Sequence, residues 1–265
     1  VIRRTVLAAN TAESFNGGAV AMQNGELALD RVTFSGNSAD GAGGAIHLTV
    51  SSADATLTMT DSTIAFNTAN LDADGSGDGG GVSVVPSGAF TATLVVRNSI
   101  VAANLDNGAT IDPDLFFSNG ALVDWQSSGF NLIGSNAGAT GTVGSGLPNV
   151  DGDYVGSAAA PLDPRLDILN NWGDEVLATH RPLLSPLSPA IDTGSCPGST
   201  GDQRRYGDAG AGQRRVDLAA VPNGFASDGC DIGAHERAGA PGADLELFLD
   251  GFEGGHTLPW ASEAL

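Results

Sequence analysis

Lysine is absent from the 265-residue sequence, and all 11 positively charged residues are arginines. The 31 aspartates and glutamates outnumber them and give a formal net charge of −20 at pH 7. The absence of lysine excludes catalysis by a lysine side chain and crosslinks of the lysine–asparagine isopeptide type. An acidic chain of this kind repels nucleic acid and anionic lipid, so neither is an expected partner, whereas it attracts divalent cations.

Aromatic residues and long apolar runs are also scarce. Only 6% of the residues are aromatic, and no apolar stretch reaches the length of a membrane span, so we expect no transmembrane helix. Glycine is abundant instead, with 38 residues. This combination is typical of stacked coils, because tight corners need Gly and a narrow interior takes Val, Ile, Leu and Ala.

Cysteine is limited to Cys196 and Cys230. A disulfide between them would restrain the unfolded chain by roughly 3–4 kcal/mol in the entropic description. The alternative is a pair of free buried thiols, and a secreted setting favours the disulfide. The sequence starts at Val1 without Met or a signal peptide, so we expect a processed piece of a longer precursor.

A repeated phrase organises the first half of the chain. A short β-branched run ending in Asn occurs four times, and these corner asparagines are 27, 30 and 37 residues apart: Asn10, Asn37, Asn67 and Asn104. A Gly-Gly step lies between the copies, at 17–18, 43–44 and 80–81. Apolar and polar residues alternate within each unit, which is the period of a strand with one buried face. Repeats of this length without a helical pattern predict an all-β solenoid of the β-helix type.

The repeat also predicts how the chain is divided. We expect the corner asparagines to form a ladder in which each amide bonds the next and tolerates a left-handed bend; the alternative is four independent Asn turns. The repeat decays after Asn104. We therefore expect regular coils over 1–134, degenerate coils and an irregular, disulfide-tied capping region over 135–236, and a linker and tail over 237–265.

Insertions fall between the Asn and the Gly-Gly step, and the longest carries the one ligand-like spacing. Oxygen-bearing side chains alternate there as in the first half of an EF-hand calcium loop: Asp72, Asp74, Ser76 and Asp78. Ser83 stands where that loop has its last acidic ligand, so Asp40 of a neighbouring coil would have to complete the shell. The two interpretations are a Ca²⁺ site and an exposed acidic loop. The acidic pairs at 112–114 and 151–153 are weaker candidates, interpreted as turns.

An ordered series of motifs resembles one family. The motifs are Asn98–Asn104, Gly129–Gly134, Leu162–Pro164, Ser188–Gly194, Asp202–Arg204 and Cys230–Glu236. Together with the GGA(I/V) and FxxN repeats, they make residues 1–236 similar to right-handed parallel β-helix proteins of bacterial surfaces, of the choice-of-anchor Q and polymorphic outer-membrane type. Residues 248–260 resemble a C-terminal tail of many secreted gammaproteobacterial proteins, with a role in export or anchoring. The resemblance implies a right-handed parallel β-helix, secreted or on the outer surface of a Gram-negative bacterium, and it implies no reaction.

Right-handed β-helices also include pectate lyases and polygalacturonases, so catalysis has to be weighed. The NTD, DD, GHG and RIK motifs that polygalacturonases share do not occur. A lyase needs a basic residue facing a Ca²⁺-binding acidic cluster. Arg31 and Arg97 could face the acidic residues of adjacent coils, but an outer, solvated face of Arg–Asp pairs explains them better. The histidines lack zinc-ligand spacing: His47, His180, His235 and His256. We predict no catalytic residues, and we expect the Arg204–Arg205 and Arg214–Arg215 pairs to form ion pairs.

The favoured hypothesis is a non-catalytic surface or extracellular structural protein: an adhesin, a stalk or a filament subunit. The chain begins inside a repeat, and an uncovered strand edge would allow head-to-tail stacking into an open fibre, with 243–260 donated to a neighbour. Expected partners are therefore further copies of the chain, and glycans or host surfaces. The alternative is a carbohydrate-active enzyme or glycan-binding module for acidic polysaccharides. That function needs a groove lined by aromatic side chains, and the coils offer few aromatic residues: Phe15, Phe34, Phe66 and Phe90. Of these, Phe34 and Phe66 are expected to face the interior.

Overall fold

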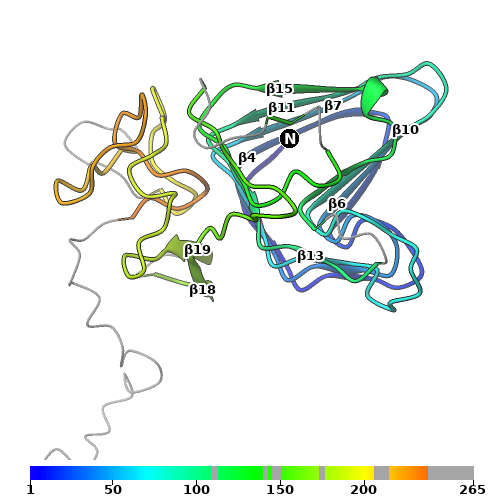
Figure 1. The fold of residues 1–265 in the computed structure, drawn as a ribbon, viewed down its shortest axis with the longest axis horizontal. Helices are drawn as coiled ribbons and strands as arrows, with labels where there is room; N and C mark the ends of the chain where they lie inside the picture. The colour runs from blue at the N-terminus through cyan, green and yellow to red at the C-terminus, as the bar shows by residue number, and fades with distance from the viewer. Residues whose placement is uncertain (109–112, 140–142, 145–150, 173–176, 206–214, 238–265) are drawn as a thin grey trace, which may run out of the picture.

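The protein is essentially all-β and built mainly from parallel strands. The computed structural model describes residues 1–108, 113–139, 143–144, 151–172, 177–205 and 215–237. In these residues the one helical element is a 3₁₀ turn, η1, at Gly120–Leu122. Figure 1 shows the parallel sheets curling around a common interior, with the segment that carries β18 and β19 beside them.

Three parallel sheets and one antiparallel hairpin account for the strands. The largest sheet contains β1 (Ile2–Ala8), β4 (Gly25–Ser35), β7 (Ala55–Thr60), β8 (Thr63–Ala65), β11 (Ala92–Arg97), β12 (Ile100–Ala102), β15 (Val123–Ser127), β16 (Leu132–Ile133) and β17 (Tyr154–Val155). The second contains β3 (Val20–Gln23), β6 (Ile46–Val50), β10 (Val82–Pro86) and β14 (Leu115–Phe117). The third contains β2 (Thr11–Ala12), β5 (Ser38–Ala39), β9 (Thr68–Ala69) and β13 (Leu105–Asp106). The hairpin consists of β18 (Leu166–Asn170) and β19 (Thr179–Pro182).

Each strand pairs with the equivalent strand of the next repeat unit. In the second sheet Val82 of β10 aligns with Ile46 of β6 on one side and with Leu115 of β14 on the other. The Gly-Gly step differs by one residue from the sequence alignment. Gly79, not Gly80, is equivalent to Gly43, and both have a positive φ, 74° and 73°. The prediction was wrong there because three consecutive glycines leave the register ambiguous.

The interior is filled by the alternating apolar residues of successive strands. In β7 the side chains of Ala55, Leu57 and Met59 are buried, and they align with equally buried residues of β11. Burying a Leu or Met side chain stabilises a fold by roughly 1.5–3 kcal/mol. In-register stacking therefore builds one continuous apolar core along the molecule.

The corner before each asparagine is made by a residue in the left-handed region. These residues are Ala9, Gly36, Phe66 and Ala103, with φ between 55° and 62°. The bend that was expected at the asparagine itself thus lies one residue earlier. Phe66 is at such a corner and is 43% exposed, so the prediction that it faces the interior was wrong, whereas Phe34 is fully buried. Strand alternation does not continue through a left-handed residue.

The corner asparagines are joined by side-chain hydrogen bonds along the stack. Nδ2 of Asn10 donates to Oδ1 of Asn37 over 2.8 Å, and the same bond links Asn37 to Asn67 and Asn67 to Asn104. Nδ2 of Asn104 then donates to Oδ1 of Asp114 over 2.9 Å. Each asparagine also donates its backbone N–H to the same oxygen of the following residue in the row. The Asn row therefore ends at a carboxyl group, which has no N–H to pass on.

A second polar row crosses the largest sheet at another corner, and the sequence analysis did not identify it. Ser62 Oγ accepts the backbone N–H of Val32, Ser99 Oγ accepts that of Ser62, and Asn131 Oδ1 accepts that of Ser99. Asp153 Oδ1 ends the row by accepting the N–H of Asn131. Asp114 and Asp153 were interpreted as turn residues, but both side chains are buried and each terminates a row.

The disulfide-tied part of the chain at 177–205 and 215–237, called the flank region below, lies beside the stacked repeat units. It contacts the same corner in four successive repeats, through Arg4, Arg31, Asp61 and Asn98. Contacts with four consecutive repeat units require the region to extend across all four, and Figure 1 shows it beside the sheets. A capping position was expected for this region. Within that expected range of 135–236, Ala139 and Val143 join the core, and Gly138 pairs with Phe116 of the last repeat unit.

Candidate functional site

The acidic insertion follows β9 and is exposed from Leu71 to Ser76. Asp74 Oδ1 accepts hydrogen bonds from the backbone N–H and the hydroxyl of Ser76, over 2.8 and 2.5 Å. These two bonds favour the ionised carboxylate and lower the pKa of Asp74. Asp78 is half-buried, and its backbone carbonyl accepts the N–H of Gly43. The loop is thus hydrogen-bonded to the neighbouring repeat unit at Asp78 and extends into solvent at Asp74.

The side chains of the expected calcium loop do not gather at one point. In the described ranges, only Cys196, Cys230 and Glu236 form a group of three acidic, His or Cys residues with ligand atoms within 4.8 Å of one another. The sulfur atoms of that group are in a disulfide, so they are not metal ligands. Asp40 Oδ2 accepts the N–H of Ser14, and Ser83 is fully buried in β10. The expected Ca²⁺ ligation by this loop stays a prediction.

Two residues at the base of the loop were missed by the sequence analysis. Asn70 and Asp106 are both buried, next to the exposed acidic segment. Asp106 aligns with Ala69 of β9, and Ala69 and the matching residues of β2 and β5, Ala12 and Ala39, are alanines. A carboxylate at an inward position where three other units have Ala is the signal that could have identified it.

The disulfide is confirmed: Cys196 and Cys230 are bonded, with their Cα atoms 6.0 Å apart. It joins two segments of the flank region that also pair through Gly194 and Cys230. Two tight hydrogen bonds hold the same segment to the stack, from Asn98 Nδ2 to the carbonyl of Asp231 and from Ser195 N–H to Asn98 Oδ1. The disulfide therefore restrains a structure that is already hydrogen-bonded to the coils.

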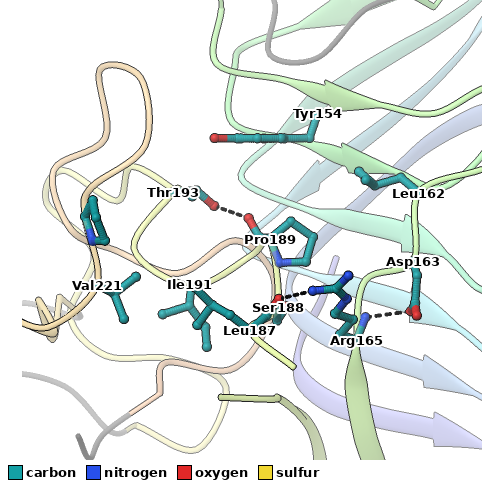
Figure 2. A pocket seen from close by; sticks show the side chains of 11 residues that line it. Tyr154, Leu162, Asp163, Arg165, Leu187, Ser188, Pro189, Ile191, Thr193 and Val221 are labelled. Atoms are coloured by element: carbon teal, nitrogen blue, oxygen red, sulfur yellow. Dashed lines mark hydrogen bonds between the residues drawn. The ribbon is translucent and has the colours of Figure 1, made fainter. Parts of the chain in front are cut away.

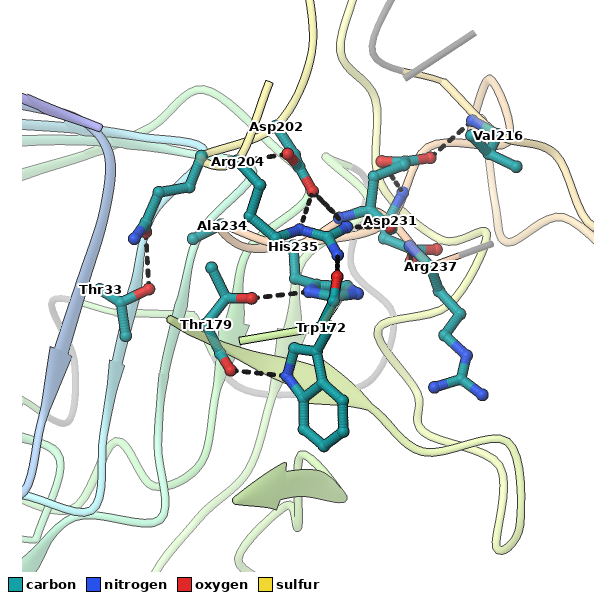
Figure 3. Close-up of polar contacts among 12 residues, drawn as sticks. Thr33, Trp172, Thr179, Asp202, Arg204, Val216, Asp231, Ala234, His235 and Arg237 are labelled. Carbon is teal, nitrogen blue, oxygen red and sulfur yellow. Dashed lines mark hydrogen bonds and ion pairs between the residues drawn. The ribbon is translucent and has the colours of Figure 1, made fainter. Parts of the chain in front are cut away.

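Arg204 is the centre of a buried polar cluster in the flank region. Figure 3 shows its guanidinium beside Asp202 and Trp172, and its N–H groups donate to the backbone carbonyls of Trp172 and Glu236. The Nη2–Oδ2 distance to Asp202 is 2.7 Å, and the carbonyl of Glu236 accepts a further bond of 2.9 Å. Buried charges of this kind are tolerated because each is paired and hydrogen-bonded. Arg204 is thus internally paired; Arg214 lies outside the described residues.

The arginines proposed for an outer solvated face are covered by the flank region instead. Arg31 pairs with Asp30 over 2.7 Å and also donates to the carbonyl of Gly201. Arg97 donates to the carbonyl of Ser195 over 2.9 Å. The side chains of Arg31 and Arg97 are therefore both hydrogen-bonded to the segment at 195–201. Of the Arg–Asp pairs expected for these two arginines, only the ion pair between Arg31 and Asp30 is present among the described residues.

The histidines lie apart from one another. His47 Nε2 contacts Thr49, and His235 Nδ1 contacts Thr179. His180 is hydrogen-bonded to Ser35, and its ring lies 4.9 Å from that of Phe66 with a tilt of 57° between the planes. Burial lowers the pKa of His47 and of His180, so both are neutral near pH 7. His256 lies outside the described residues. Of these contacts, those of His180 with Ser35 and Phe66 connect the flank region to the repeat units.

A cavity of about 350 Å³ lies where the flank region meets the last coils. Figure 2 shows Tyr154 and Leu162 on one side, Ile191 and Val221 on the other, and Arg165 at the rim. Arg165 Nη1 donates to the carbonyl of Leu187, so its charge is used to hold the rim. The lining is mostly apolar and offers no array of acids or bases for catalysis.

Comparison of the chain with known protein families, with curated protein sequences and with solved structures finds no match. Within the described ranges, no helix has the length and hydrophobicity needed to cross a membrane.

Proposed function

We propose that the chain is a right-handed parallel β-helix and a non-catalytic structural module of a secreted or cell-surface protein. The in-register parallel sheets, the Asn row and the second polar row support the fold, because each repeats once per unit. The disulfide supports an oxidising compartment outside the cytosol. A rigid stack with few exposed aromatic side chains suits a stalk or adhesin core better than a glycan-processing groove.

The observation that carries the proposal is that, among the described strands, β1, β2 and β3 are each paired on one side only. Within the described residues β1 pairs only with β4, β2 only with β5, and β3 only with β6. Their outer edges present unpaired backbone N–H and C=O groups, which are a template for adding another strand. Phe15, 72% exposed beside these strands, adds an apolar surface. We propose that this surface, the β1–β3 edge, associates with a second copy.

The two ends of the stack differ, and this favours a pair over a fibre. At the other end Ala139 and Val143 pack over the last coil, and Gly138 bridges to Phe116. Head-to-tail stacking needs one open edge at each end, whereas a two-fold pair uses the same β1–β3 edge twice and closes. The same reasoning makes an open fibre the outcome that would favour the head-to-tail filament expected from the sequence.

The proposal is tested by sedimentation of the purified chain over a range of concentrations. We expect a monomer–dimer equilibrium that Thr11→Lys combined with Ala21→Lys abolishes, because both side chains are exposed on the edge strands β2 and β3. Across a two-fold axis the added charges would repel one another. Thr58→Lys in β7 is the matched control, since β7 has neighbours on both sides. A wild-type chain that stays monomeric at the highest attainable concentration would refute the self-association, and fibres in electron micrographs would replace the pair by the filament.

A further inference from the structure

The strongest unexplained feature of the molecule is a buried amide without hydrogen bonds. Asn70 follows β9 with a φ of 51°, and its side chain is fully buried. Among the described residues, neither Oδ1 nor Nδ2 of Asn70 has a hydrogen-bond partner. A buried amide is normally satisfied by protein, water or an ion, so this one is a candidate ligand for an ion or a water molecule.

The atoms around this amide come from three separate segments. Asp106 Oδ1, Asn70 Nδ2 and the carbonyl oxygen of Gly77 lie 2.9, 3.3 and 3.4 Å from the point that a Cβ on Gly108 would occupy. Asp106 Oδ1 also accepts the N–H of Gly108 over 2.7 Å. Gly77 lies against the backbone of Gly41, so the loop is held down over this point.

We propose that Asn70, Asp106 and the carbonyl of Gly77 bind one Ca²⁺ ion. A carboxylate, a side-chain amide and a backbone carbonyl are the oxygen donors that Ca²⁺ takes in proteins, with water completing the shell. The O and N atoms of an amide are interchangeable by rotation, so Asn70 can present its oxygen to the ion. The acidic residues of the exposed loop and the net charge of −20 raise the local cation concentration.

This Ca²⁺ site is different from the alternating set at 72–78. It uses two buried side chains and one backbone oxygen at the base of the loop, and it needs no ligation by Asp72 or Asp74. It also does not depend on the proposed structural function, because a monomeric chain would bind the ion equally well.

The test is calcium titration of the full, EDTA-treated chain by calorimetry, with thermal unfolding as the second readout. We expect one site and an upward shift of the melting temperature with CaCl₂ that equal concentrations of MgCl₂ or NaCl do not give. Asp106→Asn should weaken the affinity by at least about tenfold, because ligand charge sets Ca²⁺ affinity. Asp74→Asn is the matched control and should leave the affinity unchanged. Loss of binding in Asp74→Asn with retention in Asp106→Asn would assign the ion to the exposed loop instead.

Asn70→Leu keeps the test decisive if Asp106→Asn does not fold. Leu removes the amide ligand at similar volume, but a φ of 51° disfavours Leu in either buffer, so we expect a lowered melting temperature that CaCl₂ no longer raises. A CaCl₂-dependent rise retained in Asn70→Leu would mean that Asn70 does not ligate the ion, and the proposal would be wrong. Absence of any Ca²⁺-dependent shift in the wild-type chain would overturn it as well.

Discussion

Asp114 shows at the scale of one residue how burial changes the chemistry of a side chain. Its carboxyl group terminates the Asn row, and Oδ1 accepts two hydrogen bonds from Asn104. Burial raises the pKa of Asp114 to about 7, and the bonds from Asn104 only partly oppose this shift. The ordinary pKa of 3.8 applies to the unfolded chain.

Stability should therefore fall as the pH rises through this window. Between about pH 4 and pH 7 the folded chain binds the proton of Asp114 and the unfolded chain does not, so the stabilisation is complete below pH 4 and lost above pH 7. The loss is on the order of a few kcal/mol, since one pKa unit corresponds to about 1.4 kcal/mol. Denaturant unfolding of wild type and Asp114→Asn from pH 4 to pH 8 checks this, and the variant should show the flatter profile.

Asp192 is a second buried acid whose titration also affects stability between pH 4 and pH 8, so it has to be separated from that of Asp114. Burial raises the pKa of Asp192 to about 6, so it contributes a slope of the same sign that Asp114→Asn leaves in place. Parallel pH profiles for wild type and Asp114→Asn would show that Asp114 does not titrate in this range.

At the scale of elements, the Asn row holds the turns of successive coils together. Asn37 accepts two bonds from Asn10 and donates to the carbonyl of Leu7 and to Asn67. Asn37→Ala leaves several of these groups buried without partners, so we expect a loss of about 2–4 kcal/mol in the free energy of unfolding. Asn10→Ala removes the same side chain at the exposed end of the row and should cost about 1 kcal/mol. Equal losses in the two variants, measured by denaturant unfolding, would contradict a cooperative row.

The strands and the Asn row were largely predictable, because the residues that form strands and corners repeat in the sequence. The alternation in 55–60 and the recurring Asn report local geometry directly, and their structural counterparts are β7 and the Asn row. Phe66 was misplaced because a left-handed residue reverses the side that its side chain faces. Asp114 and Asp106 were missed because their partners come from other coils, and a one-dimensional period does not carry that information.

At the scale of the whole molecule, the flank region and the stack are held together by dispersed contacts. The position of this region was not predictable, since residues 177–237 have no period and contact the coils through single residues such as Gln203 and Ala234. Gln203 accepts a hydrogen bond from the hydroxyl of Thr33, and the backbone N–H of Ala234 donates to the hydroxyl of Thr63. The disulfide is the one covalent restraint within this arrangement.

Removing the disulfide should therefore loosen the flank and leave the coils paired. The cysteines are 34 residues apart, so Cys196→Ser with Cys230→Ser should reduce stability by about 3–4 kcal/mol in the entropic description. Limited proteolysis should cut first between Cys196 and Cys230, while the β-sheet signal in circular dichroism is retained. Reductant should reproduce the effect in wild type and change nothing further in the double variant; concerted loss of all β signal would contradict a separable flank.

The asparagine row also governs how the length of such a protein can change. Each interior asparagine accepts from the coil before it and donates to the coil after it, so a duplicated unit would bond to its neighbours just as its template does. Gain or loss of whole units between Asn37 and Asn104 is therefore neutral for this row, whereas a fractional unit breaks it. Asp114 ends the row, because above its pKa of about 7 the carboxylate has no hydrogen to donate to a further unit. Variation in the number of units is thus confined to the interior of the row. Each interior amide can accept a hydrogen bond from a unit added before it, whereas the carboxylate of Asp114 cannot donate one to a unit added after it.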